Sequence, residues 1–358
     1  MSEIKQITSS IHNYTIHFEK DFSFLKSMLE QQNAVFIIDE NVFRLYRQYF
    51  LTLEGKENLI LLEAIEENKT LAASEKVFDK IISLKPTKKT SIISIGGGIT
   101  QDISGFVSST FYRGLNWTYL PTTLLAQADS CMGSKTSLNY KSYKNILGTF
   151  YPPHQIHICT QFTDTLNDED FYSGMGEVAK LHVMGRNEKL DFLISQLPLI
   201  HKRDNATLLK ITKESLDIKW TYMDGDEFDQ GKRNMLNYGH EFGHAIETAT
   251  RYKIPHGQAI VIGMILANEI ALQRNEISEE LNIKLNTLFF EILKIDYKQL
   301  NQVENNIIIN AMKQDKKRLG SGLPLIMMNG AFDFFKITDL PEEEAVKALD
   351  FFKKKYCQ

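Results

Sequence analysis

The sequence predicts an α/β domain followed by a mainly helical domain, and three observations support this prediction. With 358 residues, the chain is long for a single hydrophobic core, so two domains are expected. In the first half, short apolar runs alternate with stretches of helical periodicity, as in a doubly wound, mostly parallel sheet. From about residue 165, long amphipathic stretches dominate, and glycine and proline become sparse. We therefore expect an α/β domain over residues 1–160 and a helical domain over 161–358.

Five apolar, β-rich runs are the predicted strands of the first domain. They are AVFIID (34–39), NLILLEA (58–64), TSIISIGGG (90–98), LNWTYLPTT (115–123) and HQIHICT (154–160). Helical spacing is clear over 73–84 and over ITQDISGFVSST (99–110), between predicted strands. The second domain should contain a helix from about Leu236 that stops before Pro255, because proline cannot continue a helix. Further helices are expected over 256–275 and 278–295.

Composition and charge exclude several classes of protein. Apolar residues make up 43% of the chain and charged residues 24%, which is typical of a globular protein, and the formal net charge is −4. No overall basic field therefore favours nucleic acid or an anionic membrane. No signal-peptide core or membrane-length apolar run is present, and the three cysteines form no C-x-x-C pair. We expect a cytoplasmic protein without a membrane or nucleic-acid partner.

Gly96, Gly97 and Gly98 stand directly between a predicted strand and a predicted helix. Glycine lets a backbone approach a pyrophosphate closely, and a helix N-terminus offers free N–H groups to it. The motif is not G-x-G-x-x-G, and a tight strand–helix turn explains it equally well by itself. Asp39 and Asn41 end an earlier strand at the same sheet edge, where they would bond a ribose or adenine or simply form a turn.

The segment GHEFGHAIE (239–247) contains the zinc-protease pattern H-E-x-x-H. On a helix His240 and His244 share a face, whereas Glu241 points about 100° away. The third ligand of such proteases is absent downstream, and the next histidine is His256, at the start of the following helix. Two interpretations of these histidines therefore remain: they bind a metal, or they are a pair of hydrogen-bonded surface histidines. The ligand spacing of a zinc protease is excluded.

Nine stretches, in order over residues 96–317, resemble the 3-dehydroquinate synthase family, the sugar phosphate cyclases. They are GGGITQDISGF, YRG, LPTTLLAQADS, GSKTSLN, KNILGTFYPP, SGMGEVAK, KRNMLNYGHEFGHAIE, PHGQAIVIGM and MKQDKK. The segments DEN (39–41) and EENK (66–69) also resemble nucleotide-contacting positions of the family. Short motifs are weak evidence singly, but their common order makes this resemblance specific.

The resemblance implies a dehydroquinate synthase-like fold, with NAD on the first domain and metal and substrate on the second. The implied reaction closes 3-deoxy-arabino-heptulosonate 7-phosphate to 3-dehydroquinate. A hydroxyl is oxidised by NAD, phosphate leaves by β-elimination, the ketone is reduced, the ring opens, and an intramolecular aldol closes the carbocycle. A divalent metal, typically zinc, with cobalt as an alternative, binds the hydroxyl being oxidised.

The resemblance also assigns residues. The implied metal ligands are Glu177, His240 and His256. The implied substrate-phosphate contacts are Lys135, Asn145, Asn237, His244 and Arg113, with Arg113 reaching into the partner's site of a homodimer. Lys219, Arg233 and Lys316 match positions that bind the substrate carboxylate, and Lys180 and Asp129 lie near the reacting hydroxyls. The implied NAD contacts are Asp39, Asn41, Glu66, Lys69, Gly97, Gly98, Asp102, Thr122, Thr123, Lys144, Thr165 and Leu166.

A few positions depart from the usual pattern of the family. Ser134 and Ser137 replace glycines around Lys135, and Ser142-Tyr143 replaces Leu-Gly. Gln258 replaces a glutamate, which we interpret as a carboxylate lost from the surroundings of the metal. These changes leave the ligands and cations in place but put the exact sugar in doubt.

Four alternatives differ from this reading in chemistry. A related cyclase would act on an amino or other sugar phosphate, although a neutral sugar would not need the three carboxylate-binding cations. A metal-dependent NAD alcohol dehydrogenase of similar fold would release NADH and need no phosphate donors. The ligand spacing disfavours a zinc protease. The complete set of expected ligands disfavours a catalytically inactive binding protein.

Overall fold

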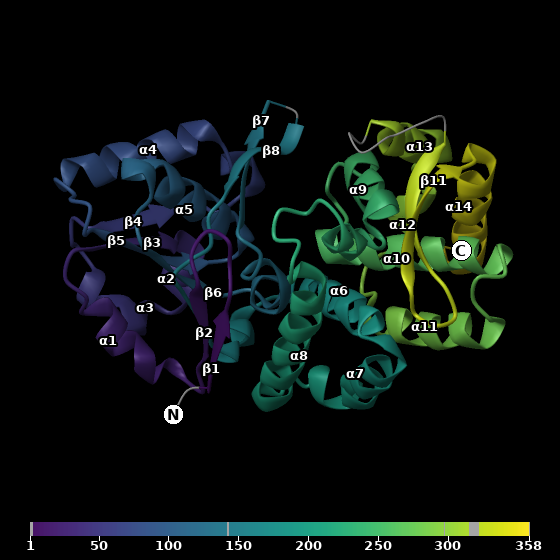
Figure 1. Ribbon diagram of the computed structural model, residues 1–358, viewed down its shortest axis with the longest axis horizontal. Coiled ribbons are helices and arrows are strands. Elements are labelled where there is room, and N and C mark those ends of the chain that lie inside the picture. The colour runs from purple at the N-terminus through teal and green to yellow at the C-terminus, as the bar shows by residue number, and fades with distance from the viewer. Residues whose placement is uncertain (1–2, 142, 297, 315–321, 358) are drawn as a thin grey trace. The chain divides into compact units, whose positions relative to one another are not determined.

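The computed structural model describes residues 3–141, 143–296, 298–314 and 322–357 (Figure 1). The chain divides into two compact units, residues 1–166 and 167–358. The boundary expected at residue 160 falls at the start of the 3-10 helix η6 (Thr160–Thr165), which belongs whole to the first unit. Lys316 lies outside the described residues.

A seven-stranded sheet forms the centre of the first unit. Its strand order is β1 (Glu3–Ile7), β2 (Tyr14–Phe18), β9 (Gln155–Ile158), β6 (Trp117–Pro121), β5 (Ser91–Gly96), β3 (Ala34–Asp39) and β4 (Leu59–Leu62). Only the pair β1–β2 is antiparallel; the other pairs are parallel. The mostly parallel sheet and its five predicted strands are confirmed. Strands β1 and β2 were not predicted, and β1 (EIKQI) is exposed over most of its length.

Helices cover both faces of this sheet, as expected for parallel strands buried on two sides (Figure 1). The helices are η1 (Phe22–Phe24), α1 (Leu25–Leu29), α2 (Glu40–Leu45), α3 (Arg47–Phe50), η2 (Leu51–Leu53), η3 (Glu66–Asn68), α4 (Leu71–Ser83), α5 (Gly98–Thr110), η4 (Phe111–Arg113) and the π-helix η5 (Ala126–Ser130). Leu25, Phe36, Phe50 and Ile95 belong to one buried core between the sheet and α1–α3. A separate antiparallel hairpin is formed by β7 (Lys135–Tyr140) and β8 (Tyr143–Phe150).

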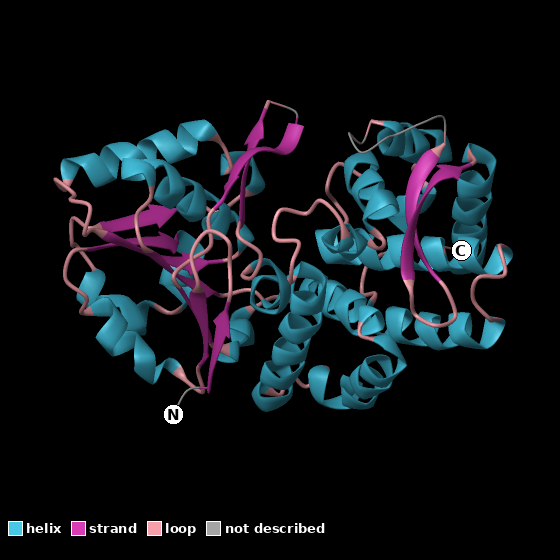
Figure 2. Cartoon of the chain, viewed as in Figure 1, coloured by secondary structure: helices cyan, strands magenta, loops and turns pink. Residues whose placement is uncertain are grey.

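The second unit is mainly helical, as predicted (Figure 2). Its helices are α6 (Asp168–Met184), α7 (Arg186–Ile200), α8 (Asn205–Met223), η7 (Lys232–Asn237), α9 (His240–Ala249), α10 (His256–Gln273), α11 (Glu279–Ile292), α12 (Lys298–Asn301), α13 (Asn305–Lys313) and α14 (Glu342–Tyr356). Helix α10 is buried along residues 257–271, so it is the central helix of the unit. The hairpin β10 (Leu323–Met328) and β11 (Phe334–Leu340) was not predicted, because a fully apolar run such as LPLIMM does not distinguish strand from helix.

One predicted helix boundary is wrong. A single helix from Leu236 was expected, but η7 ends at Asn237 and α9 begins only at His240. Gly239 between them has φ +81°, a left-handed backbone conformation that breaks the helix and suits glycine. Helix α9 ends at Ala249, which agrees with the expected stop before Pro255.

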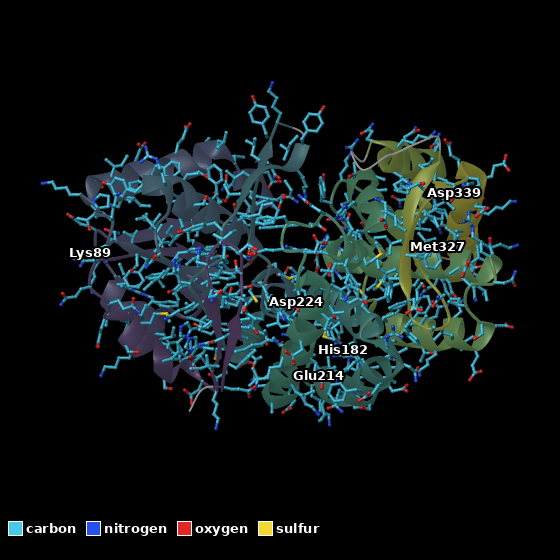
Figure 3. The ribbon with its side chains drawn as sticks, viewed as in Figure 1. Lys89, His182, Glu214, Asp224, Met327 and Asp339 are labelled. Atoms are coloured by element: carbon cyan, nitrogen blue, oxygen red, sulfur yellow. The ribbon has the colours of Figure 1, made fainter. Side chains whose placement is uncertain are left out.

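The buried His182 on α6 lies near the partly buried Glu214 on α8, without a hydrogen bond between the two side chains. His182 Nε2 lies 3.9 Å from Glu214 Oε2, and His182 Nδ1 lies 2.8 Å from the Val178 carbonyl (Figure 3). Burial lowers the pKa of His182 to about 4, so the ring is neutral and serves packing. Among the described residues, no helix is both long and apolar enough to cross a membrane.

Candidate active site and metal centre

The first unit has a topological switch point between β3 and β5. These neighbouring strands continue in opposite directions along the sheet, β3 toward β4 and β5 toward β6. Ligands of open α/β sheets bind at such a point, outside the carboxyl ends of the strands. Asp39 ends β3, and the triple glycine begins with Gly96, the last residue of β5. The sheet therefore brings together the two segments that the sequence suggested for a nucleotide.

The glycine loop is tight, because threonine side chains pack closely against the backbone of Gly96 and Gly97. A Cβ on Gly96 would lie 2.4 Å from Thr100 Oγ1, and a Cβ on Gly97 would lie 3.0 Å from Thr123 Cγ2. Gly97 is the N-cap of α5, and no side chain caps that terminus. The N-terminal N–H groups of α5 are thus available to an anion, which is the geometry that a pyrophosphate needs.

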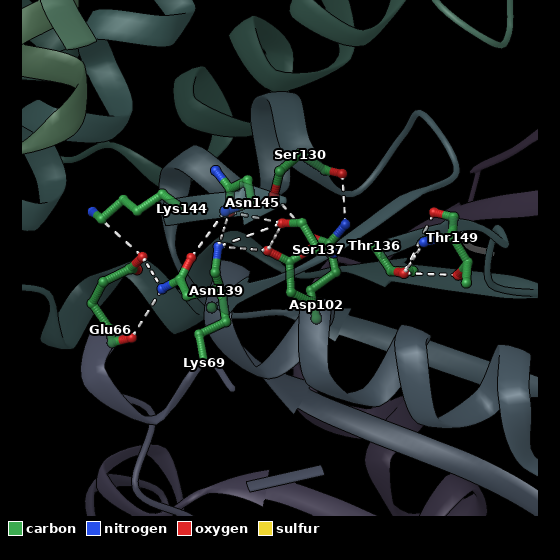
Figure 4. Close-up of polar contacts among 12 residues, drawn as sticks. Glu66, Lys69, Asp102, Ser130, Thr136, Ser137, Asn139, Lys144, Asn145 and Thr149 are labelled. Atoms are coloured by element: carbon green, nitrogen blue, oxygen red, sulfur yellow. Dashed lines mark hydrogen bonds and ion pairs between the residues drawn. The ribbon is translucent and has the colours of Figure 1, made fainter. Parts of the chain in front are cut away.

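Asp102, on the first turns of α5, is the centre of a polar network (Figure 4). Lys69 Nζ lies 3.0 Å from Asp102 Oδ2 and 2.6 Å from Asn145 Oδ1. Ser137 donates to Asp102 twice, from its backbone N–H (2.9 Å) and from its hydroxyl (2.9 Å). Burial raises the pKa of Asp102, and the Lys69 charge opposes that rise. The network ties the hairpin β7–β8 to the helix that carries the glycine loop.

A second branch of this network anchors the same hairpin to η3. Asn139 Nδ2 donates to Glu66 Oε1 at 2.8 Å, and Lys144 Nζ lies 3.4 Å from that same oxygen (Figure 4). Asn145 has φ +51°, and its backbone N–H donates to Asn139 Oδ1 at 3.0 Å. Three separate segments of the sequence contribute to this cluster, with Glu66 and Lys69 from the first, Asp102 from the second, and Lys144 and Asn145 from the third.

The other expected cofactor contacts have local structural partners. Asp39 caps α2, because its Oδ1 accepts from the N–H of Asn41 at 2.8 Å. Thr122 is buried and donates from its N–H to the Gly96 carbonyl at 3.0 Å. The Thr165 hydroxyl lies 3.0 Å from the Tyr46 hydroxyl, and Leu166 closes η6.

In the second unit, each expected metal ligand stands beside a glycine that allows close helix packing. A Cβ on Gly176 would lie 2.2 Å from the Gly257 carbonyl oxygen, and one on Gly257 would lie 1.7 Å from the Ser173 carbonyl oxygen. A Cβ on Gly239 would lie 2.6 Å from Met264 Cγ. Glu177, His240 and His256 follow or precede these glycines directly. Helices α6, α9 and α10 therefore approach closely where the ligands lie.

The three ligand atoms converge at distances that suit a metal ion. His256 Nε2 lies 3.1 Å from Glu177 Oε1, and His240 Nε2 lies 3.6 Å from the same oxygen. In a tetrahedral zinc site with bonds of about 2.0 Å, ligand atoms lie about 3.3 Å apart. Glu177 is almost fully buried, and two imidazoles with one carboxylate are a common catalytic zinc set. The residues present fit a divalent metal with an open coordination position.

The electrostatics of this centre are strongly coupled. Burial acts to raise the pKa of Glu177, but the Lys180 charge and the His256 hydrogen bond hold it below its usual range. Burial acts to lower the pKa of His256, but hydrogen bonds to Glu177 and Glu247 raise it to about 10. Burial and the neighbouring Lys180, His244 and His256 lower the pKa of His240 well below normal. Without metal, a proton on His256 neutralises the cluster.

Glu247, to which the sequence pattern assigned no role, contacts one of the expected metal ligands. Its Oε2 lies 3.0 Å from His256 Nδ1, on the side of the ring opposite Glu177. A carboxylate on the far nitrogen fixes the tautomer and orientation of a metal-binding histidine. The available signal was its spacing on α9, where Glu247 lies one turn beyond His244 and close to the same face.

His244 lies beside the other two histidines but is exposed. Its ring centroid is 5.1 Å from that of His240 and 5.7 Å from that of His256. The ligand atoms of these three histidines all lie within 4.8 Å of one another. Glu241, the base of the protease pattern, is not part of this group of described residues. Both histidines of the HEFGH segment therefore lie close to His256, and Glu241 is not part of this group.

Further cations of the second unit are buried, which is unusual for such side chains. Lys180, next to Glu177 on α6, forms an ion pair with it. Lys219 on α8 and Arg233 in η7 are 6% and 5% exposed, and these two elements pack together. The Arg233 guanidinium donates to the Glu227 carbonyl, and Asn237 Nδ2 donates to the Asn234 carbonyl at 2.9 Å.

The remaining expected residues lie in the first unit. Arg113 is exposed in η4 and has φ +67°, and Asp129 is half-buried in the π-helix η5. Lys135 is exposed at the start of β7. The structure places these three on separate elements, and Asn145 belongs to the Asp102 network.

The expectation for Gln258 is wrong. Its Nε2 donates to the carbonyls of Tyr172 (2.8 Å) and Ile292 (3.3 Å), and its Oε1 accepts from the N–H of Lys294 (2.7 Å). Gln258 is 1% exposed and bonds only to backbone groups in these contacts. It joins α6, α10 and the end of α11, so the change from glutamate bears on packing rather than on the metal's surroundings.

The chain is similar to known proteins over both units. Residues 59–173 match the model for the N-terminal part of 3-dehydroquinate synthase, and residues 174–318 match the C-terminal part. The 3-dehydroquinate synthase of Clostridium tetani is 32% identical over 326 residues, covering 90% of this chain and 86% of that protein. That of Thermoanaerobacter pseudethanolicus is 30% identical over 353 residues, covering 97% and 98%.

Two solved structures share the fold. The 2-epi-5-epi-valiolone synthase of Streptomyces hygroscopicus, with NAD+ and Zn2+ bound, superposes with a TM-score of 0.84 at 21% identity and covers 99% of each chain. A 2-deoxy-scyllo-inosose synthase with carbaglucose-6-phosphate, NAD+ and Co2+ gives 0.81 at 24% identity, covering 97% of this chain and 99% of that one. The fold class is therefore confirmed. With family models matched across both units, the chain belongs to the 3-dehydroquinate synthase family.

Proposed function

We propose that this chain catalyses the 3-dehydroquinate synthase reaction of the shikimate pathway. It would close 3-deoxy-arabino-heptulosonate 7-phosphate to 3-dehydroquinate and release phosphate. The observation that carries the proposal is the convergence of Glu177, His240 and His256 beside the buried Lys180, in a chain whose two halves match this family. Three protein ligands leave a metal open to a substrate hydroxyl.

NAD and a divalent metal, most simply zinc or cobalt, are the proposed cofactors. When bound, they supply hydride transfer and polarisation of the reacting hydroxyl. The donor set for the metal is described above, and NAD is assigned to the switch point of the first unit. Support for this comes from the uncapped N-terminus of α5, the close approach at Gly97, and the Asp39 carboxylate at the end of the neighbouring strand.

The chain's own residues have distinct proposed tasks. Lys180 is placed to hold or move a proton at the reacting hydroxyls, because its ammonium lies against Glu177 inside the centre. His244 is proposed to donate to the substrate phosphate rather than to bind metal, since it is exposed beside two more buried histidines. Asn237 would assist there from η7. A held phosphate can itself accept the proton in the elimination step.

Lys135 and Asn145 are further proposed phosphate donors. Lys135 and Asn145 come from the hairpin β7–β8, and Asp129 would lie near the reacting hydroxyls. Arg113 is proposed to enter the site of a partner copy, which makes the protein a homodimer. Its exposure and left-handed backbone in η4 support a projecting side chain.

The substrate carboxylate distinguishes this reaction from that of the neutral-sugar cyclases. Lys219 and Arg233 are proposed to bind it, together with Lys316, which lies outside the described residues. Both side chains are buried on elements that pack together, and two neighbouring positive charges suit the carboxylate of an acidic substrate. The free, buried cysteines of the chain are typical of a reducing compartment, which supports a cytoplasmic location.

One assay tests the proposal against its competitors. Purified protein is given the heptulosonate phosphate with NAD and zinc, and phosphate, 3-dehydroquinate and NADH are followed before and after chelation. Phosphate and dehydroquinate should appear in equal amounts without accumulation of NADH. Glucose 6-phosphate, which lacks a carboxylate, is the matched control and should give no phosphate. NADH rising with substrate loss would identify a dehydrogenase, and turnover of the control instead would identify a neutral-sugar cyclase.

A further inference from the structure

A second cluster of metal-binding side chains lies in the first unit, on β2 and β9. His17 and His157 are direct partners in the parallel register of these strands. Partners in register point to the same face of a sheet, and Glu19, two residues beyond His17, shares that face. Two imidazoles and one carboxylate are therefore presented together, which is the same donor set as in the metal centre of the second unit.

The distances within this cluster suit a shared ligand. The ligand atoms of His17, Glu19 and His157 all lie within 4.8 Å of one another. His157 Nδ1 lies 2.9 Å from Glu19 Oε1, and His157 is only 8% exposed. Phe24 stacks on His157 with ring centroids 5.4 Å apart, so an apolar ring covers one side of the cluster. Partial burial of nitrogen and oxygen donors limits competition from water for a bound metal.

We propose that His17, Glu19 and His157 form a second binding site for a divalent transition-metal ion of the zinc, nickel or copper class. Nitrogen-rich sites with one carboxylate suit these ions rather than magnesium or calcium. The site is separate from the centre at Glu177, His240 and His256, since all of its ligands belong to the first unit.

Metal binding at this site requires the His17 ring to rotate. The rings of His17 and His157 are stacked, with centroids 4.4 Å apart and planes 9° apart. A metal must lie near the plane of each ring, and parallel planes share no such point. His17 is only half-buried, and Thr15 Oγ1 lies 3.0 Å from its Nε2. We expect its ring to turn out of the stack, while His157, held between rings, stays in place.

The consequence of binding is a cross-link at the edge of the sheet. Strand β2 carries the hairpin with β1, and its pairing with β9 spans only Thr15 to Phe18. A metal held by β2 and β9 together would fasten this hairpin to the parallel part of the sheet. A ligand that binds only the folded state stabilises it, so the unfolding midpoint should rise with metal concentration.

Counting bound zinc on the chelated and reconstituted protein tests this. Wild type should hold about two ions per chain, and His240→Ala and His17→Gln should each hold about one. Glu19→Gln, which keeps the size of the side chain, should bind the second ion at least about tenfold more weakly. The matched control is His12→Gln. His12 belongs to another stacked pair, with His154 (4.0 Å), outside the cluster, and the variant should keep both ions.

NMR resonances of the histidine ring nitrogens identify the zinc ligands directly, which a change in protein stability would not do. In His240→Ala, the first equivalent of zinc should shift the ring nitrogens of His17 and His157 and leave those of His12 unchanged. A wild-type chain that binds a single ion would overturn the proposal. So would two ions in a folded His17→Gln variant, because the second ion would then lie elsewhere. Neither result would affect the synthase assay, which depends on the second-unit centre.

Discussion

Glu247 and Glu177 hold the two nitrogens of one imidazole. Glu247 Oε2 lies 3.0 Å from His256 Nδ1, and Glu177 Oε1 lies 3.1 Å from His256 Nε2. The ring is thereby fixed in orientation, with one nitrogen turned to the other ligands. We infer that Glu247, on α9, positions His256 for metal binding without itself being a ligand.

Replacing Glu247 with Gln should weaken zinc binding about 10- to 100-fold, the usual effect of losing an orienting carboxylate. Activity should return when zinc is added in excess, because the ligands themselves remain. The measurement is a competition titration with a chromogenic chelator, read together with turnover. Glu241→Gln, on the same helix, is the control and should keep wild-type affinity. Equal losses in both variants would assign the effect to helix α9 as a whole.

Zinc binding should release protons. The two carboxylates raise the pKa of His256 to about 10 in the metal-free protein, so the ring carries a proton at neutral pH. Metal and proton compete for this nitrogen, and the apparent affinity should therefore fall about tenfold per pH unit as pH is lowered from about 8 to 6.5. Calorimetry in buffers of different ionisation enthalpy measures the release directly, with about one proton per zinc expected. A binding enthalpy independent of the buffer would contradict this protonation state.

His244→Ala should separate metal binding from turnover. We assign His244 to the substrate phosphate, so the variant should keep about one zinc ion in the second-unit centre and lose at least about 100-fold in turnover. His240→Ala is the matched comparison, and it should lose that ion. Metal analysis and phosphate release on the same preparations give both quantities. Equal loss of zinc in the two variants would instead place His244 among the ligands, as the clustering of the three histidines also permits.

Gln258→Glu should destabilise the fold without altering the metal. The carboxylate cannot donate to the carbonyls of Tyr172 and Ile292, and its charge would be buried between them. We expect a loss of about 2–3 kcal/mol in the free energy of unfolding, measured with urea on metal-free protein. Gln258→Met, which removes the same hydrogen bonds without a charge, should lose less. A stable Gln258→Glu variant with changed zinc affinity would restore the idea that this position tunes the metal.

The sequence predicted secondary-structure elements well where hydrophobic periodicity agreed with glycine, proline or polar turn residues at the ends. It predicted them less well where backbone conformation or contacts between distant residues determine the structure. The five parallel strands and the helix after Gly98 were predictable because apolar runs end at glycine or polar turns. The helix start at His240 was not, because the left-handed Gly239 is visible only in the backbone. Gln258 was misread for a related reason: its partners are carbonyls of residues far away in sequence. The metal ligands themselves came from resemblance, since Glu177 and His240 are widely separated in the chain.

Ser137, which takes the place of a glycine in the usual family pattern, should strengthen the cofactor side of the first unit. Its hydroxyl donates at 2.9 Å to Asp102 and lies 2.9 Å from Asn145 Oδ1, so it joins α5 to the hairpin β7–β8. Removing one such hydrogen bond costs about 1 kcal/mol, and Ser137→Gly should therefore bind NAD about fivefold more weakly. Titration of NAD by quenching of protein fluorescence measures this. Ser109→Ala is the control, because Ser109 contacts the same hairpin through Thr149, away from Asp102. The same loss in the control would attribute the effect to the hairpin's attachment in general, whereas unchanged affinity in Ser137→Gly would remove Ser137 from the cofactor site.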